Sequence, residues 1–160
     1  MTAAEETPAG PPRTFAMGTH EALFPSDRVY AEKTHLWLAP SDDGRYRVGL
    51  TAYSVRLLND VYFLDWSVDG GTDVRDRQDV GEIESSKAVS SLHVPAAGRI
   101  VSFNESVLAD PSAINTDTYG EGWLYEFETD AEFVGVDEYV DALTAAWDRD
   151  QRYLKKQANA

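Results

Sequence analysis

Short runs of alternating apolar and polar residues fill most of the chain, a pattern typical of half-buried strands. Turn residues such as the Gly70-Gly71 pair separate these runs every few positions. One run, residues 61–66, is apolar on both faces until Asp65, and this predicts a central strand. The pattern predicts strands at residues 29–39, 46–50, 61–66, 72–74, 99–103 and 123–128, the first two joined as a hairpin by a turn at 41–44.

Helical patterns are short except near the C-terminus. Thr51 suits the first turn of a helix over residues 51–59, and Asn59 suits a left-handed exit from it. We expect the strand at 99–103 to end at Asn104-Glu105. After it, Pro111 predicts a single helical turn. Apolar residues then recur near helical spacing and predict an amphipathic helix over residues 136–156, at Val136, Val140, Leu143, Trp147 and Leu154.

The segment from Gly81 to Gly98 predicts a strand, a tight turn and a second strand, with Lys87 at the tip. Only small residues flank this lysine, so nothing bulky shields its amine; they are Ser85, Ser86 and Ala88. A lysine held on a hairpin tip, without an adjacent acid to neutralise it, is well placed for covalent modification. We interpret Lys87 as the attachment point of a prosthetic group and the rest of the chain as its mount.

Many short strands with frequent turns, together with flanking helices, predict a mainly β sandwich or small barrel. The length of 160 residues suits one domain with a proper core. The formal charge of −14 argues against nucleic acid as a partner, because phosphate contacts need clustered Lys and Arg. The chain has no cysteine, so any thiol chemistry must arrive on a cofactor.

Residues 1–12 lack the apolar segment of a signal peptide, and no apolar run approaches the length of a membrane span. We therefore expect a cytoplasmic protein with a partly disordered N-terminal tail and no membrane partner. The scattered histidines His20, His35 and His93 lack metal-ligand spacing, so we predict no metal site. No nucleophile motif organises the Ser, His and Asp residues, and we predict no catalytic residues.

Six motifs in consistent order resemble the glycine cleavage system H protein, a lipoyl carrier. They are Thr34-His35-Leu36-Trp37, Val48-Gly49-Leu50-Thr51, Asp60-Val61-Tyr62-Phe63, Glu84-Ser85-Ser86-Lys87-Ala88, Pro95-Ala96-Ala97-Gly98, and Asp110-Pro111 through Ile114-Asn115 to Tyr119-Gly120-Glu121-Gly122-Trp123. The resemblance implies a hybrid barrel-sandwich of the lipoyl-domain type. It also implies lipoic acid amide-linked to Lys87 in an attachment turn formed with Glu84, Ser85, Ser86 and Ala88. Biotin carriers have methionines on both sides of the modified lysine, whereas Ser86 and Ala88 flank Lys87, so lipoate is favoured.

The resemblance also divides the chain into three parts. Residues 1–28 form an N-terminal tail or arm, residues 29–130 the lipoyl-type domain, and residues 131–160 a C-terminal helix packed on it. In the H protein two positions each carry an acidic residue, and these two acids help to hold a cationic aminomethyl cargo in a cleft. Here those positions are Leu36 and Ser91, whereas His35 is either part of that cleft or a packing residue beside Trp37.

An ammonium group without a carboxylate in a dry cleft is disfavoured, so the two departures favour a different cargo. They resemble the H-like lipoate-binding proteins of sulfur oxidation, whose partners would be a heterodisulfide-reductase-like complex and dihydrolipoamide dehydrogenase. The alternative is a glycine cleavage H protein with glycine decarboxylase and aminomethyltransferase as partners. Either carrier is non-catalytic and needs lipoate-attaching enzymes. A third hypothesis, an interaction module without lipoate, keeps only the fold.

Overall fold

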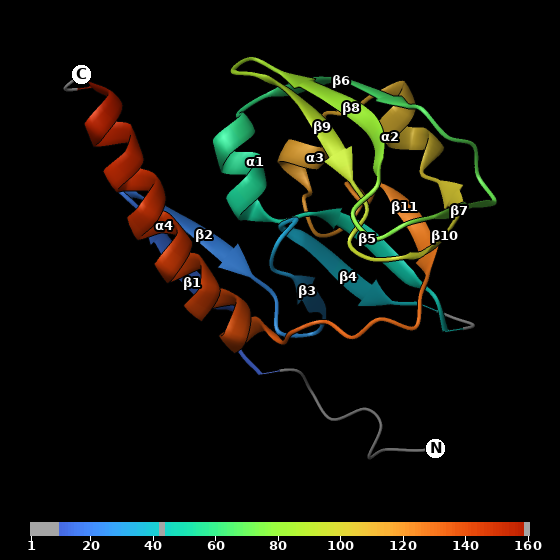
Figure 1. The fold of residues 1–160 in the computed structure, drawn as a ribbon, viewed down its shortest axis with the longest axis horizontal. Helices are drawn as coiled ribbons and strands as arrows, with labels where there is room; N and C mark the ends of the chain where they lie inside the picture. The colour runs from blue at the N-terminus through green and yellow to red at the C-terminus, as the bar shows by residue number, and fades with distance from the viewer. Residues whose placement is uncertain (1–9, 42–43, 159–160) are drawn as a thin grey trace.

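The computed structural model describes residues 10–41 and 44–158, with side chains as far as residue 149. Strands dominate this part of the chain and form three sheets (Figure 1). A two-stranded hairpin consists of β1 (Arg13–Met17) and β2 (His20–Phe24). A six-stranded sheet has the order β3 (Val29–Ala31), β4 (Leu36–Pro40), β5 (Tyr46–Leu50), β11 (Tyr125–Glu128), β10 (Gly98–Phe103) and β7 (Thr72–Val74). A three-stranded sheet has the order β6 (Val61–Trp66), β8 (Asp79–Ser85) and β9 (Val89–His93).

The two larger sheets enclose the main core. Alternate residues of each strand point inward, so apolar side chains from both sheets meet between them. The central members of this core are fully or almost fully buried, and they include Leu38, Val48, Val80, Ile83, Ile100 and Phe127. This mainly β arrangement of sheets, with helices around it, confirms the predicted barrel-sandwich hybrid.

The predicted strand at residues 29–39 is wrong as a single element. It is divided into β3 and β4, which pair antiparallel across a turn closed by the backbone N–H of His35 and the carbonyl of Ala31 at 2.9 Å. His35 adopts a φ of 56°, which a non-glycine residue rarely takes. The run contains no Gly or Pro to indicate this turn, and only its exposed Glu32 and Lys33 mark the break in the apolar pattern.

The prediction that residues 61–66 form a central strand is also wrong. This segment is β6, an edge strand of the three-stranded sheet, where β8 is central. The register between β6 and β8 shifts between Val61 and Phe63, so Tyr62 is an extra residue in the ladder. As a result Tyr62 and Phe63 both leave the core, with exposed fractions of 61% and 43%. The apolar character of both faces therefore reflects an exposed aromatic pair.

Three short helices connect the sheets. In α1 (Ala52–Leu58) the Thr51 hydroxyl accepts from the backbone N–H of Ser54, and Asn59 follows the helix with a φ of 64°, so the predicted helix is confirmed. The turn predicted at Pro111 is present as α3 (Ala113–Thr116). The sequence pattern did not predict α2 (Glu105–Ala109), whose N-terminus is capped by the side chain of Asn104.

A second core joins the N-terminal hairpin to α4 (Val136–Ala158), which confirms the amphipathic helix predicted at residues 136–156 (Figure 1). Aromatic rings fill this core, and the ring of Tyr139 stacks on Tyr30 at a centroid distance of 4.8 Å. The Tyr139 hydroxyl lies 3.0 Å from the Thr51 hydroxyl and 2.9 Å from Nδ1 of His35. These bonds connect α4 to the start of α1 and to the turn between β3 and β4. The expected N-terminal tail lies, up to residue 9, outside the described residues.

Candidate functional site

Lys87 is exposed at the tip of the turn between β8 and β9, as predicted. The buried Ser85 side chain holds this turn from below. Its hydroxyl accepts hydrogen bonds from the backbone N–H groups of Lys87 and Ala88, at 3.3 and 3.2 Å, and donates to the carbonyl of Ala88 at 3.2 Å. The backbone N–H of Ser86 donates to the carbonyl of Asp60 at 2.8 Å, which ties the turn to the segment after α1. The amine is thus presented on a rigid base.

The surroundings leave the Lys87 amine available for reaction. Among the side chains that the structure describes, no carboxylate forms an ion pair with it. Glu84, the nearest acid along the strand, lies opposite Phe63 and Val89 in the sheet register. Lys87 is exposed, and so are its neighbours Ser86 and Ala88. An amine in this setting is accessible to a large modifying enzyme.

A cavity of about 300 Å³ lies between α1 and the three-stranded sheet, beside β9, and is called the apolar cleft below. The structure brings Leu36 and Ser91 together in its wall. Leu57, which the sequence analysis did not select, adds a further apolar side chain to the wall and is 47% exposed. The complete lining is Lys33, Thr34, Leu36, Leu50, Ser54, Leu57, Leu58, Ile83, Ser90, Ser91, Leu92 and His93. Within this lining no side chain is a carboxylate.

His35 is placed apart from Leu36 and Ser91. Its ring packs against Tyr53 at a centroid distance of 4.7 Å, and its Nδ1 atom lies 2.9 Å from the Tyr139 hydroxyl. It is absent from the wall of the apolar cleft. Of the two roles that the sequence left open for His35, packing in the aromatic core agrees with this position.

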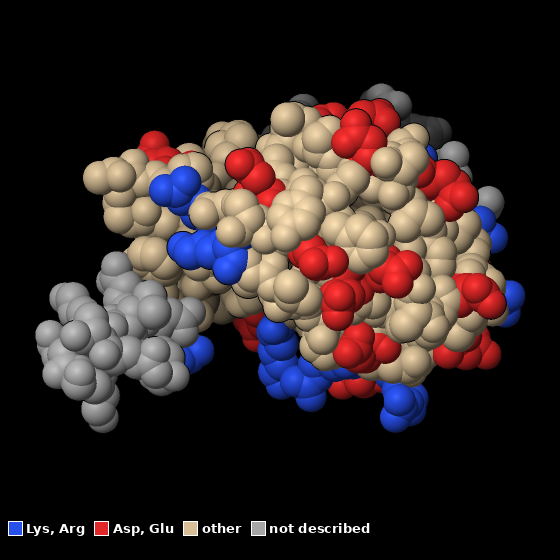
Figure 2. Space-filling view, turned by 90° about the horizontal axis from the view of Figure 1, so that it is seen from above, with Lys and Arg blue, Asp and Glu red and all other residues tan. Residues whose placement is uncertain are grey.

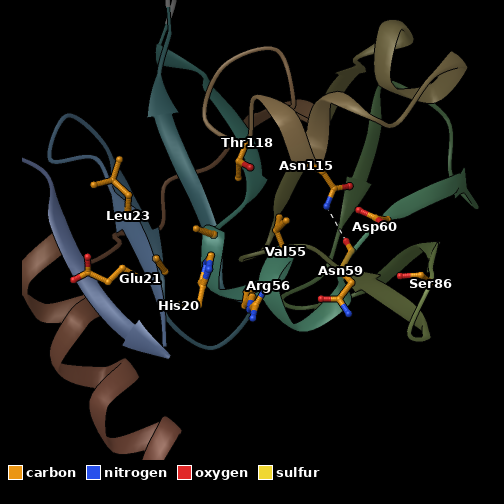
Figure 3. A pocket seen from close by; sticks show the side chains of 12 residues that line it. His20, Glu21, Leu23, Val55, Arg56, Asn59, Asp60, Ser86, Asn115 and Thr118 are labelled. Carbon is orange, nitrogen blue, oxygen red and sulfur yellow. Dashed lines mark hydrogen bonds between the residues drawn. The ribbon is translucent and has the colours of Figure 1, made fainter. Parts of the chain in front are cut away.

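A second hollow, of about 510 Å³, lies on the other side of α1 and is called the polar groove below. Figure 3 shows Ser86 and Asp60 at one end of it and Glu21 and Leu23 of β2 at the other, with Arg56 between. Asn115 orders one wall, because its Oδ1 accepts from the backbone N–H of Val61 and its Nδ2 donates to the carbonyl of Asn59. Helix α1 therefore separates two hollows of different chemistry close to the turn that carries Lys87.

The site consists of an exposed anchor, Lys87, and two adjacent hollows. Among the described residues, no three His, Asp or Glu side chains gather as metal ligands would. Within the same part of the chain, no helix is both long and apolar enough to cross a membrane. An exposed lysine beside an apolar cleft fits a long acyl arm, because the arm can move in solvent or bury its aliphatic part in the cleft.

Comparison with known proteins identifies the family. The model of the glycine cleavage H-protein family matches residues 28–147, most of the chain. The chain belongs to the glycine cleavage H-protein family. It is 38% identical over 109 residues to a glycine cleavage system H protein of Mycolicibacterium vanbaalenii, which covers 68% of this chain and 82% of the relative. A second such protein, from Psychrobacter, is 36% identical over 121 residues, 76% of this chain and 91% of the relative.

A solved structure agrees with the family assignment. The crystal structure of a glycine cleavage system H protein from Mycobacterium marinum matches with a TM-score of 0.65 and 38% identity. The match covers 74% of this chain and 97% of the other chain. Proteins of the H-protein family are non-catalytic carriers that use covalently attached lipoic acid, and this chain is a carrier of that kind. The hairpin β1–β2 lies before residue 28, where the family match begins.

Proposed function

We propose that Lys87 carries the lipoyl group and that Glu84, Ser85, Ser86 and Ala88 form the turn that presents it. The observation that carries the proposal is the position of Lys87, exposed and without a described ion-pair partner on a turn closed by Ser85. Attachment is an acyl transfer in which Nζ attacks the carbonyl carbon of an acyl adenylate. The new C–N bond replaces the C–O bond to adenylate, which leaves, and the nitrogen releases a proton to solvent.

Lipoic acid supplies a dithiolane, which is the sulfur chemistry that a chain without cysteine lacks. The chain contributes the anchor, and acylation removes the positive charge of the lysine. It also contributes the apolar cleft, where Leu36 and Leu57 offer an apolar surface against which the aliphatic part of the arm would pack. After attachment the bond-making chemistry takes place on the lipoyl group and its partner enzymes, and the side chains of this protein only hold the arm.

We further propose that the carrier serves glycine cleavage and passes an aminomethyl cargo between glycine decarboxylase and aminomethyltransferase. Support comes from the relatives, because the family model and the relatives described above are all glycine cleavage proteins. This replaces sulfur oxidation, which the departures at Leu36 and Ser91 favoured and which none of these comparisons supports. Loss of two acidic positions changes how a cargo is held without changing the family.

One observation keeps a second candidate, an H-like lipoate-binding protein for sulfur oxidation with a heterodisulfide-reductase-like complex as partner. The apolar cleft contains leucines and serines but no carboxylate to balance an ammonium group. An uncompensated charge in such a place costs several kcal/mol, roughly, whereas a neutral or sulfur-bearing cargo avoids this cost.

The experiment presents the protein, after lipoylation by a lipoate ligase, to glycine decarboxylase with isotopically labelled glycine. Glycine cleavage predicts label on the unchanged chain by intact mass spectrometry, and none on the Lys87→Arg variant. A lipoylated protein that accepts no label, yet exchanges electrons or sulfur with a heterodisulfide-reductase-like complex, would contradict the proposal and favour the second candidate.

A further inference from the structure

Three large apolar side chains surround the base of the lysine turn and lie outside both cores. Tyr62, Phe63 and Val89 have exposed fractions of 61%, 43% and 60%. Phe63 and Val89 both lie opposite Glu84 in the register of β6, β8 and β9, so they belong to one row across the sheet. The β-bulge brings Tyr62 to the surface as well. An exposed aromatic pair of this kind is typical of a protein interface.

Acidic residues accompany these side chains. In the next row of the sheet Asp65 lies opposite Glu82, and Glu82 lies opposite Ser91. Figure 2 looks onto the molecule from the side of this sheet and shows acidic side chains spread over it, with Lys and Arg toward the margins. The face thus combines apolar anchors with a negative surround. A complementary partner has an apolar pocket with basic residues around it.

We propose that Tyr62, Phe63 and Val89, with Asp65, Glu82 and Glu84 among them, form a docking face for the enzyme that attaches lipoate to Lys87. This inference rests on the proposed lipoylation. The attaching enzyme must bring its acyl adenylate within bonding distance of Nζ, so its body has to cover the turn and the adjoining sheet. Enzymes that react with the far end of the arm act about one arm length away from Nζ, so the arm leaves them free to approach the carrier from other sides. The position of the face, directly beside the turn, therefore favours the attaching enzyme.

The first test measures kcat/KM for lipoylation by a lipoate ligase with lipoate and ATP, for the full chain and the double variant Tyr62→Thr, Phe63→Thr. Threonine keeps the preference for strand, and both positions are exposed. Loss of two central anchors is expected to lower kcat/KM about tenfold or more. The matched control is Leu108→Ala, which removes an exposed leucine of α2, keeps the preference for helix and is expected to change kcat/KM less than about twofold.

Equal rates for the double variant and the unchanged chain would overturn the docking face while leaving lipoylation of Lys87 in place. If the unchanged chain takes up no lipoate, both the docking face and the proposed function fail. Thermal unfolding of each variant shows that it is folded. Should the double variant unfold, Val89→Thr replaces it, and the same loss of rate is expected, because Val89 is exposed on β9.

The second test uses salt. Attraction between the acidic face and a basic enzyme predicts that kcat/KM of the unchanged chain falls as ionic strength rises from about 0.05 M to about 0.5 M. Asp65→Lys is expected to lower kcat/KM at low salt and to flatten this dependence. The control is Asp141→Lys on α4, which keeps the dependence of the unchanged chain. A rate independent of salt, or equal behaviour of the two lysine variants, would overturn the basic character assigned to the partner.

Discussion

The hydroxyl of Ser85 lies 3.2 Å from both the amide nitrogen and the carbonyl oxygen of Ala88, so one buried side chain bridges the turn that presents Lys87. The same hydroxyl accepts from the backbone N–H of Lys87. Ser85 is 4% exposed, and its position below the turn fixes the direction in which the lysine leaves the sheet. The presentation of the amine therefore depends on a buried residue beneath the turn.

Ser85→Ala removes these bonds and is expected to lower the free energy of unfolding by about 1–2 kcal/mol. The looser turn is also expected to slow lipoylation of Lys87, because the amine is no longer held in one direction. Urea unfolding and the rate of lipoylation measure the two effects. Ser86→Ala is the matched control: this side chain is exposed, and the expected change in stability is below about 0.5 kcal/mol. Equal effects of the two substitutions would contradict the bridging role of Ser85.

Ser91→Asp is expected to prolong retention of an aminomethyl cargo, because it places a carboxylate in a cleft that has none. The control Ser91→Asn adds a side chain of similar size without charge. We expect the loaded fraction after a fixed time to rise a few-fold with Asp and to stay unchanged with Asn. The measurement is mass spectrometry of protein loaded by glycine decarboxylase. Equal retention in both variants would show that the cargo does not meet position 91.

The buried tyrosines predict loss of stability at alkaline pH. Burial raises the pKa of the Tyr125 phenol, as it does for Tyr30, Tyr119 and Tyr139. Phenols of the unfolded chain ionise near pH 10, so above about pH 10 the folded state retains protons that the unfolded state releases. The stabilisation is complete below about pH 10 and is lost as the pH rises above it, by about 1.4 kcal/mol per pH unit for each such tyrosine.

Tyr125→Phe is therefore expected to reduce the slope of unfolding free energy against pH by about 1.4 kcal/mol per unit above about pH 10. Tyr125 is almost fully buried, and phenylalanine retains its ring contacts. Urea unfolding at several pH values measures the slope. Below about pH 9 the variant and the unchanged chain should differ by a constant amount, which serves as the internal control. Parallel curves above about pH 10 would contradict the role assigned to burial.

Local signals in the sequence predicted the lysine turn and α1. Small residues around Lys87 marked the turn, and Thr51 and Asn59 marked the ends of the helix, because caps and turns depend on neighbouring residues. The pairing of Leu36 with Ser91 followed from the resemblance. Leu57 follows Ser54 by three positions, so both reach the apolar cleft from one face of α1, but nothing in the sequence marks Ser54 as part of that wall.

The errors arose where tertiary structure decided. The segment 29–39 contains no Gly or Pro to indicate the turn before β4, and only the exposed Glu32 and Lys33 interrupt its apolar pattern; the positive φ at this turn is taken by His35. Tyr62 and Phe63 of β6 suggested a buried strand, because the pattern of apolar residues cannot distinguish a buried strand from an edge strand with a bulge. The hairpin β1–β2 depends on contacts with α4 from the opposite end of the chain. Predicted boundaries at residues 1–28, 29–130 and 131–160 stay predictions.

The central claim is that Lys87 is the single point at which this carrier holds lipoic acid. Intact mass spectrometry after incubation with lipoate, ATP and a lipoate ligase tests it most directly. The unchanged chain is expected to gain one lipoyl increment, Lys87→Arg none, and Lys33→Arg, at a lysine in the apolar cleft, one. Peptide mapping is expected to place the increment on Lys87. A lipoyl increment on Lys87→Arg, or none on the unchanged chain, would contradict the account.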